Sequence, residues 1–239
     1  MQRPRTAGNQ DALAIAERVA AVRARIAQAA ARAGRNPASV TLVAVSKTAP
    51  AHRVYAAYLT GIRDFGENRV DEALAKQDEL PSDSVWHMIG HIQSRKARDV
   101  VGRFALVHSL DSLGLAETLQ RRAEVANARA SVLLEVNVAG EESKYGFALA
   151  DVAAAVGSVG RLDRLDVRGL MTMAPIVADP EAARPVFRAL RELRDRLRAE
   201  YPALDLDELS MGMTDDFEVA IEEGATLVRV GRAIFGERH

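Results

Sequence analysis

Short apolar runs alternate with helix-like segments eight times between residue 39 and the end of the sequence. The runs are rich in Val, Leu and Ile, as are the strands of a sheet that is covered on both faces. They lie at 39–45, 64–67, 85–90, 105–110, 131–138, 166–173, 207–212 and 225–231. Strands that alternate with helices predict a parallel sheet with crossover helices. Eight such units in about 200 residues match the size of a (β/α)8 barrel.

The segments between the runs complete this pattern. Helices are expected near 51–60, 69–79, 94–102, 112–127, 148–159, 180–200 and 215–223, with a short one at 232–237. A further helix is predicted at 11–33, because Leu13, Val19 and Ile26 follow helical spacing and Gly34 can end it. An open doubly wound sheet is the alternative, but it usually has fewer strands and a Gly-rich first turn, which "SKTAPAHR" lacks.

We therefore predict an α/β fold, a single (β/α)8 TIM barrel with an extra N-terminal helix. No Pro/Ser-rich linker, low-complexity tract or exact repeat divides the chain, so one domain is expected over residues 1–239. The strand at 64–67, "DFGE", is the weakest of the eight because it is very short.

Composition excludes several classes of protein. The net charge is −1, and the arginines at 184–198 are interleaved with acids as on a solvated helix face, so we expect no binding to nucleic acid or a membrane. There is no cysteine, which excludes disulfides and thiolate metal sites and fits a reducing cytosol. The first residues lack a signal peptide's apolar core, and no stretch approaches the roughly 18 apolar residues of a membrane span. A cytoplasmic protein is expected.

The first strand, in "VTLVAVSKT", runs directly into a lysine. Lysine is rare here, since only four of the 32 basic residues are lysines: Lys47, Lys76, Lys96 and Lys144. Strand parity places Val43, Val45 and Lys47 on one face, so Lys47 would cap the barrel interior and point into the mouth. Partial desolvation there would favour the neutral, nucleophilic amine. A lysine that only pairs with Glu67 is an equally open interpretation.

Two loops near the C-terminus have the features of a phosphate site. Barrels often hold a phosphate between the loops after strands 7 and 8 and the start of a short helix. "LSMGMTDDFEVAI" and "VRVGRAIFG" occupy these places; Ser210 and Thr214 offer hydroxyls, and Gly212 and Gly231 allow close approach of backbone N–H groups. Helix capping by Thr214 or Asp215 and an ordinary turn at Gly231 are the alternative, which the acids at 215–216 favour locally because they oppose a nearby anion.

Arg229, in "TLVRV", shares a strand face with Leu227. An arginine that points into a barrel needs a partner because it keeps its charge, and the candidates are Glu135, a ring nitrogen or an anionic ligand. A lysine, a phosphate cradle and an arginine on one rim suggest pyridoxal 5′-phosphate, whose aldehyde forms a Schiff base with lysine. Since arginine only donates, a ring nitrogen that faces it stays unprotonated and the ring is a poor electron sink.

Other polar residues near the strand ends have less definite roles. His87 and His91 are four apart, but a strand is expected there and no Glu lies between them, so a solvated or capping role is predicted and no metal site. Asn68 either caps the next helix or touches a ring substituent. Lys144 and Tyr145 are either loop residues or candidates for a second acid/base.

The chain resembles the pyridoxal phosphate homeostasis protein family. The matching stretches run in order from about residue 40 to the C-terminus: "LVAVSKT", "FGENRVDEALAK", "WHMIGHIQSRKAR", "VHSLDS", "EVNVAGEESKYGF", "GLMTMAP" and "LSMGMTDDFEVAIEEGATLVRVGRAIFG". The resemblance implies a single barrel of the alanine-racemase type without that enzyme's second domain. It also implies pyridoxal phosphate held as a Schiff base.

The cofactor-binding residues implied by the resemblance are Lys47, Asn68, Ser210, Arg229, Gly231 and Arg232. Lys47 would carry the Schiff base, while Ser210 and the backbone at 231–232 would hold the phosphate. Arg229 would lie beside the ring nitrogen and Asn68 near the ring. Many members have threonine at position 232, so the contact implied for Arg232 is through its backbone.

Members of this family are thought to carry and buffer the cofactor in pyridoxal phosphate and amino acid homeostasis, and the resemblance implies no catalysis. The alternative is a pyridoxal phosphate-dependent racemase or decarboxylase on the same barrel, which needs a second acid/base on the opposite ring face. A Schiff-base aldolase is a third hypothesis, against which the first-strand position of Lys47 argues. We expect pyridoxal phosphate as a partner, pyridoxal phosphate-dependent apoenzymes as recipients, and a monomer.

Overall fold

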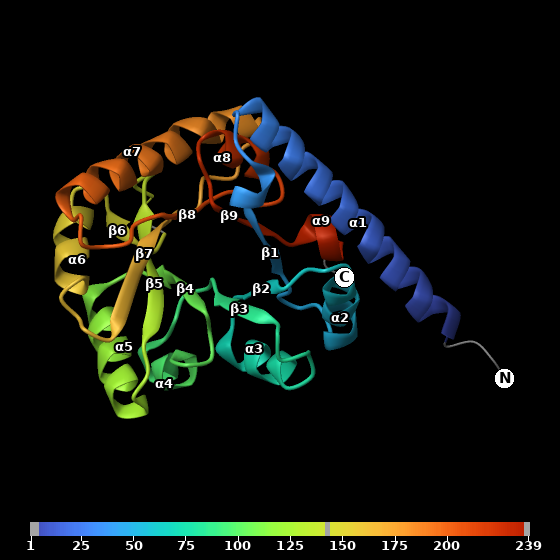
Figure 1. Ribbon diagram of the computed structural model, residues 1–239, viewed down its shortest axis with the longest axis horizontal. Helices are drawn as coiled ribbons and strands as arrows, with labels where there is room; N and C mark the ends of the chain where they lie inside the picture. The colour runs from blue at the N-terminus through green and yellow to red at the C-terminus, as the bar shows by residue number, and fades with distance from the viewer. Residues whose placement is uncertain (1–4, 142–143, 237–239) are drawn as a thin grey trace.

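The computed structural model describes residues 5–141 and 144–236. Eight parallel strands close into a barrel: β1 (Thr41–Val45), β2 (Asp64–Glu67), β3 (Val85–Met88), β4 (Leu106–Leu110), β5 (Ala130–Asn137), β7 (Leu165–Met171), β8 (Glu208–Ser210) and β9 (Leu227–Val230). β9 pairs with β1 and β4 pairs with β5, which completes the circle (Figure 1). The predicted (β/α)8 barrel is confirmed. The short "DFGE" run is a full strand that pairs with both β1 and β3.

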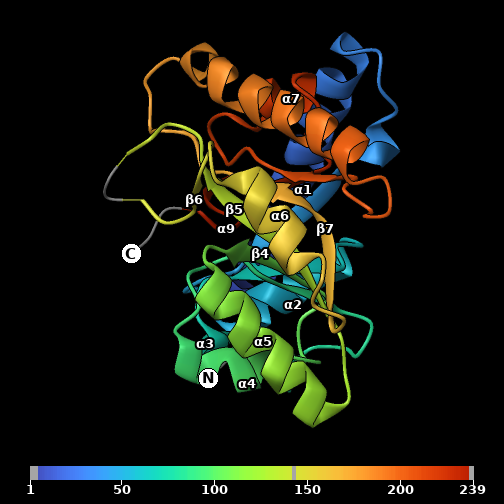
Figure 2. The ribbon, with the colours of Figure 1, turned by 90° about the vertical axis from the view of Figure 1, so that its left-hand side faces the viewer.

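Helices cover the outside of the barrel. They are α2 (Ala51–Leu59), α3 (Val70–Gln77), α4 (Ala97–Val100), α5 (Leu113–Ala126), α6 (Val152–Val159), α7 (Arg184–Glu200), α8 (Phe217–Glu222) and α9 (Arg232–Phe235). Short 3-10 turns lie at η1 (Pro37–Ser39), η2 (Ser94–Lys96) and η3 (Pro180–Ala183). Figure 2 shows α5, α6 and α7 following one another around the side formed by β5 and β7. Each predicted helix is present, mostly with shorter bounds.

The predicted N-terminal helix is α1 (Arg5–Arg32), which begins before the expected residue 11. Its buried stripe includes Ile15, Val19, Val22 and Ile26, and it packs against α2, α8 and α9 (Figure 1). These apolar residues recur every three or four positions, so a single helix face covers one side of the barrel.

Strand lengths differ from the sequence expectation. β8 has three residues where six were expected, although Met211 N donates to the Leu227 carbonyl and Arg229 N to the Gly212 carbonyl beyond its end. A two-residue strand, β6 (Phe147–Ala148), adds to β5 outside the barrel circle. Nothing in the apolar pattern predicted β6, since its pairing depends only on backbone groups.

The barrel interior holds one layer of apolar side chains below a polar layer. Val43, Leu106, Leu133, Met171 and Leu227 form this apolar cluster. The predicted inward parity of β1 and β9 is therefore confirmed by Val43 and Leu227. The residues two positions further along these strands are Val45 and Arg229, which line the cavity at the carboxyl ends. A larger apolar cluster lies between the strands and the surrounding helices.

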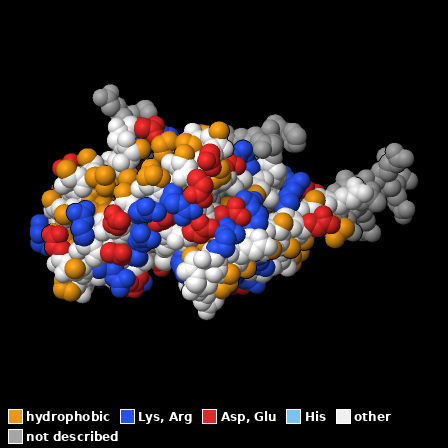
Figure 3. All heavy atoms as spheres, turned by 90° about the horizontal axis from the view of Figure 1, so that it is seen from above, with side chains coloured by type: hydrophobic (Ala, Val, Ile, Leu, Met, Phe, Trp, Pro, Cys, Tyr) orange, Lys and Arg blue, Asp and Glu red, His pale blue; other side chains and the backbone are white. Residues whose placement is uncertain are grey.

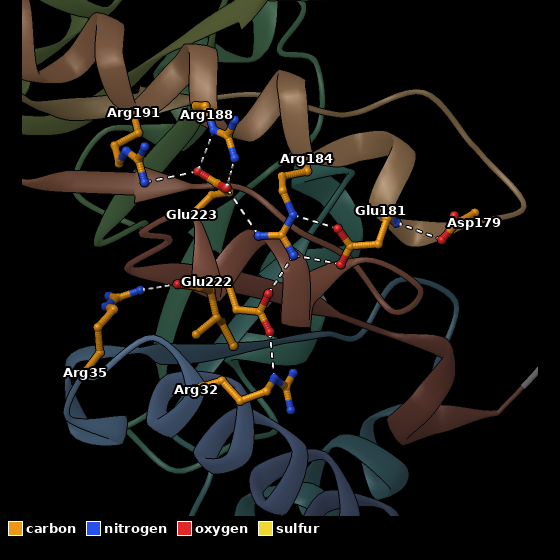
Figure 4. Close-up of polar contacts among 10 residues, drawn as sticks. Arg32, Arg35, Asp179, Glu181, Arg184, Arg188, Arg191, Glu222 and Glu223 are labelled. Atoms are coloured by element: carbon orange, nitrogen blue, oxygen red, sulfur yellow. Dashed lines mark hydrogen bonds and ion pairs between the residues drawn. The ribbon is translucent and has the colours of Figure 1, made fainter.

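Charged side chains on α7 form a network with α8 and α1. Glu223 is buried and accepts from Arg184, Arg188 and Arg191 (Figure 4). The prediction of a wholly solvated arginine face is therefore wrong at this point, because the end of α8 brings a carboxylate under α7. Figure 3 shows basic and acidic side chains interspersed over this face. Within the described residues, no helix is long and apolar enough to cross a membrane.

Candidate functional site

A cavity of about 480 Å³ opens at the carboxyl ends of β1, β2 and β9. Five of the six predicted site residues line it: Lys47, Asn68, Arg229, Gly231 and Arg232. They come from the ends of strands far apart in the sequence, and parallel pairing brings those ends to one face.

The turn that carries Lys47 is held by buried polar contacts. Ser46 Oγ donates to Glu67 Oε1 at 2.7 Å, and Lys76 Nζ donates to the Ser46 carbonyl at 2.7 Å. Lys76 Nζ also lies 2.5 Å from Glu67 Oε1, so the buried carboxylate is met by a lysine of α3. Thr48 follows with φ of 64°, a conformation in which the backbone turns sharply away from the strand.

Ser210 lies outside the cavity lining, and its side chain is fully buried. Its Oγ accepts from Arg229 Nη1 and lies 2.8 Å from His108 Nδ1. Thr48, after β1, and Thr214, which lies four residues beyond Ser210, both line the cavity. The structure therefore brings Ser210 to the arginine rather than to the cavity wall.

The loop after β8 presents Thr214 because of two local features. Gly212 has φ of 90°, and a Cβ on it would lie 2.6 Å from Ala220 Cβ, so only glycine fits this close crossing over α8. Asp216 Oδ1 accepts from Met213 N at 2.6 Å, which closes the loop without Thr214. Burial raises the pKa of Asp216. The interpretation of Thr214 or the residue after it as the cap of α8 is wrong, since Asp216 is the N-cap residue.

The second acid of this loop, Asp215, forms an ion pair with Arg232 on the cavity rim. This pair joins the loops after β8 and β9. It also offsets the negative charge of Asp215, one of the two acids that would oppose an anion in the cavity. Gly231 precedes Arg232 and is the N-cap of α9; a Cβ on Gly231 would lie 3.2 Å from the Val45 carbonyl.

Arg229 is buried and donates to two neighbours. Nη1 donates to Ser210 Oγ at 2.5 Å and Nη2 to the Thr172 carbonyl at 2.9 Å. Burial lowers the pKa of Arg229 to about 10, against the opposing charges of Glu135 and Asp216, so the guanidinium stays charged at neutral pH. Burial and the charge of Asp111 raise the pKa of Glu135 to about 7, although Arg229 opposes this.

Asn68 does not cap the next helix. The N-cap residue of α3 is Arg69, and no side chain bonds the first turn. Asn68 Oδ1 is buried in the cavity wall without a hydrogen-bond partner. Its backbone packs tightly on Gly90, where a Cβ would lie 2.4 Å from the Asn68 carbonyl oxygen. A buried amide oxygen without a partner is rare, and Asn68 is also one of the residues that line the ligand-sized cavity.

The two histidines of "WHMIGH" have different environments. His87 is buried inside the barrel, so the prediction of a solvated or capping role is wrong for it; strand β3 turns its ring toward β4. His91 lies near the mouth, with Nδ1 2.7 Å from Asp111 Oδ2, and its ring stacks on Tyr145 at 4.1 Å. The part of the chain that the structure describes contains no cluster of metal-ligating residues.

Several residues of the cavity carried no sequence signal. Arg53 of α2 lines it and donates from Nη2 to the Phe235 carbonyl at 2.7 Å. Met173 and Ile176, after β7, form an exposed apolar part of the rim. Thr214 did have a signal, namely a hydroxyl two residues after a loop glycine.

The closed barrel with a lysine and an arginine at its mouth belongs to a known class. Residues 18–239 match the model of the family described as "Alanine racemase, N-terminal domain". Two curated relatives are named pyridoxal phosphate homeostasis protein. The one from Pseudomonas aeruginosa is 48% identical, and the match covers 94% of this chain and 96% of that protein. The one from Aquifex aeolicus is 46% identical, and the match covers 93% of this chain and 97% of that protein. The solved structure of PipY from Synechococcus elongatus with PLP bound has a TM-score of 0.81 and is 40% identical, covering 93% of this chain and 100% of that one. The chain belongs to the pyridoxal phosphate homeostasis protein family.

Proposed function

We propose that this chain binds pyridoxal 5′-phosphate at the barrel mouth, covalently through Lys47, and carries and buffers the cofactor. The observation that carries the proposal is a single cavity lined by Lys47, Arg229, Thr214 and the 231–232 backbone. Family membership supports it, since the relatives are named for pyridoxal phosphate homeostasis and PipY was solved with the cofactor.

The residues present fit the phosphate group. Thr214 supplies a hydroxyl, and the amides at the start of α9 have no acceptor within their own helix. Gly231 lets this segment approach β1 closely. Arg53, which also pairs with Asp11, is a basic side chain in the wall of the cavity, and Arg232 offsets the negative charge of Asp215. We therefore assign the hydroxyl contact to Thr214 in preference to Ser210.

The residues also fit the pyridine ring. Two of the five N–H groups of an arginine are used by Ser210 and Thr172, which leaves the others of Arg229 for the cavity. Because Arg229 cannot accept a proton, a ring nitrogen beside it has to accept. Asn68 Oδ1, which lacks a partner in the wall, suits a polar substituent on the ring.

Lys47 is the lysine placed to form the covalent bond. Its amine would hold the cofactor, whose aldehyde would supply the carbon for a Schiff base with release of water. Lys76 and Lys96 are not among the described residues that line the cavity. An unprotonated ring is a weak electron sink, so this site suits holding the cofactor better than transforming an amino acid.

We further propose that the chain does not turn over amino acids. Racemisation needs a second acid/base on the opposite ring face. Among the described residues that line the cavity there is no tyrosine or histidine, and Lys47 is the only lysine. Tyr145 instead stacks on His91. Transfer to apoenzymes and a monomeric state stay predictions.

The test is reduction of the cofactor-loaded protein with borohydride followed by peptide mass analysis. With four lysines in the chain, the label has four places to go: Lys47, Lys76, Lys96 and Lys144. We expect it on Lys47, lost in Lys47→Arg and retained in Lys144→Arg. A label confined to another lysine would contradict the site, and a protein that cannot be loaded at all would contradict the function. For catalysis, exchange of Cα protons with deuterated solvent at an enzyme-like rate of roughly 1 s⁻¹ or more would argue for a racemase.

A further inference from the structure

A continuous chain of hydrogen bonds crosses the barrel interior from one mouth to the other. Asp64 Oδ1 lies 3.0 Å from His87 Nε2, and His87 Nδ1 lies 2.9 Å from His108 Nε2. His108 Nδ1 lies 2.8 Å from Ser210 Oγ, which accepts from Arg229 Nη1. Asp64 begins β2, whereas Arg229 lies near the end of β9, so the chain runs from the amino ends of the strands to the carboxyl ends.

The chain is sealed along most of its length. His108 and Ser210 are fully buried, and His87 and Arg229 are each 4% exposed. The Asp64 side chain is 31% exposed and lines a second cavity, of about 410 Å³, on the amino side of the barrel. Solvent therefore reaches one end of the chain at Asp64, while the other end faces the cofactor cavity.

The two ends determine where each proton lies. The Asp64 carboxylate only accepts, so His87 Nε2 carries a proton and, in a neutral ring, His87 Nδ1 accepts from His108 Nε2–H. His108 Nδ1 is then an acceptor. At the other end Arg229 only donates, so Ser210 Oγ accepts from it and directs its own hydroxyl proton to His108 Nδ1. The proton positions assigned from Asp64 and those assigned from Arg229 agree at Ser210, and every donor in this chain of hydrogen bonds has one acceptor.

This arrangement requires both imidazoles to be neutral with the proton on Nε2. A charged His108 would turn an N–H toward Ser210 Oγ, and the hydroxyl would then accept two hydrogen bonds and lose His108 as the acceptor of its own proton. Burial lowers the pKa of His108 well below its usual value, and the charge of Arg229 acts in the same direction. The contact between the two rings is edge-on, at 79°, which aligns Nε2–H of one ring with Nδ1 of the other.

We propose that Asp64, His87, His108 and Ser210 are positioning residues for Arg229, so that a change at the opposite mouth of the barrel alters the cofactor cavity. The Thr172 carbonyl holds Nη2, and the chain holds Nη1 by presenting a Ser210 oxygen whose proton is committed to His108. Without His108 the hydroxyl proton loses its acceptor, so the Ser210 side chain is no longer held in the rotamer that presents Oγ to Nη1. The effect on the cofactor rests on the proposed function, whereas the arrangement of protons does not.

The first experiment measures the histidine tautomers by ¹⁵N NMR in protein without cofactor. We expect His87 and His108 to be neutral and protonated on Nε2. Asp64→Asn removes the carboxylate that orients the chain, and we expect the ¹⁵N shifts of both rings to change. Asp83→Asn is the matched control. Asp83 is an acid at the amino-side mouth of the barrel, and it pairs with Arg63, which is not part of the chain of hydrogen bonds. A proton on His108 Nδ1 in the unmodified protein, or His108 shifts that do not differ between the two variants, would overturn the proposal.

The second experiment measures the dissociation constant and absorption maximum of bound pyridoxal phosphate. His108→Phe keeps an aromatic ring, slightly larger than imidazole, but removes both nitrogens, and we expect binding about tenfold weaker because a buried hydrogen-bond partner is lost. For Asp64→Asn we expect an effect of about two- to fivefold through the coupled chain. Both variants should shift the absorption maximum, and Asp83→Asn should not.

A purely structural role would lower the melting temperature of the variants while leaving affinity and absorption maximum unchanged, and that result would overturn the proposal. If His108→Phe does not fold, Asp64→Asn decides alone, since its position is partly exposed. If the unmodified protein binds no cofactor, the proposed function fails. The tautomer measurement still decides whether the chain of hydrogen bonds from Asp64 to Arg229 exists.

Discussion

Lys76 and Glu67 form a buried ion pair beneath the turn that presents Lys47, with Nζ 2.5 Å from Oε1 and side chains 10% and 0% exposed. The same ammonium donates to the Ser46 carbonyl at 2.7 Å. Burial raises the pKa of Glu67, while Lys76 and Ser46 lower it by hydrogen bonding and leave Oε2 without a partner. The pair thus joins α3, β2 and the end of β1 at the base of the cavity.

Replacing Lys76 by methionine should destabilise the fold by about 3–5 kcal/mol, because a buried carboxylate loses its counter-charge. The free energy of unfolding, from denaturant titration, measures this. Lys96→Met is the control, since Lys96 and Asp71 form an exposed pair that should contribute only about 0–1 kcal/mol. Equal losses in the two variants would contradict the assignment of Glu67 as a charged, Lys76-dependent group.

Glu135 should make stability fall as the pH rises. Its pKa is raised by folding from 4.5 to about 7, so the folded state holds the proton more tightly than the unfolded chain. Stability is therefore lost between about pH 4.5 and 7, by roughly 3 kcal/mol at most, and the loss persists above that range. Glu135→Gln removes this contribution.

Unfolding free energies at pH 5, 6, 7 and 8 test this point. The difference between Glu135→Gln and the unmodified protein should move in favour of the variant with increasing pH, whatever its value at pH 5. Glu117→Gln, an exposed position on α5, provides the control for a change of one charge. A difference that is constant with pH would mean that Glu135 titrates alike in both states.

Thr214 and Ser210 should differ in their effect on phosphate binding. Thr214→Ala removes a cavity hydroxyl and should weaken pyridoxal phosphate binding by about 1.5–3 kcal/mol, the range for a hydrogen bond to a charged group. Its affinity for pyridoxal, which lacks the phosphate, should be unchanged, and Thr214→Ser should retain most of the binding.

Ser210→Ala acts through Arg229 and should weaken pyridoxal and pyridoxal phosphate binding alike, since the arginine faces the ring in our proposal. Equilibrium titration with both ligands gives the four affinities. If instead Ser210→Ala weakens the binding of pyridoxal phosphate but not that of pyridoxal, then Ser210 contacts the phosphate, as the family resemblance implies, and our assignment of this contact to Thr214 is wrong.

Gly212→Ala should disrupt the loop that presents Thr214. The residue has φ of 90°, and the new Cβ would lie 2.6 Å from Ala220 Cβ and 2.8 Å from Phe217 Cα. Strain and overpacking together should cost about 3 kcal/mol or more in the free energy of unfolding. Gly114→Ala on α5 is the matched control, because nothing lies within 4 Å of its Cβ and alanine favours a helix. A stable Gly212→Ala protein with normal cofactor affinity would refute the need for this crossing.

Local patterns in the sequence determined the fold and the position of the cavity. The alternation of strands and helices depends on periods of two and 3.6 residues, which are visible within a single segment. Parity then placed Val43 and Arg229 inside the barrel, and both are there. Five of six predicted site residues line one cavity for the same reason, since every parallel strand ends on the same face.

Contacts across the barrel were decided only by the tertiary structure. Whether Ser210 or Thr214 reaches the cavity depends on where β8 stops pairing, and the partner of His87 depends on the register between β3 and β4. The pairing of β5 with β7 even shifts between Val132 and Leu133, an irregularity that no hydrophobic pattern reveals. The ion pair of Lys76 with Glu67 and the hydrogen bonds of His108 both join residues from separate βα units. Strand register and barrel closure decide which polar side chains meet, and neither can be read from the sequence of a single segment.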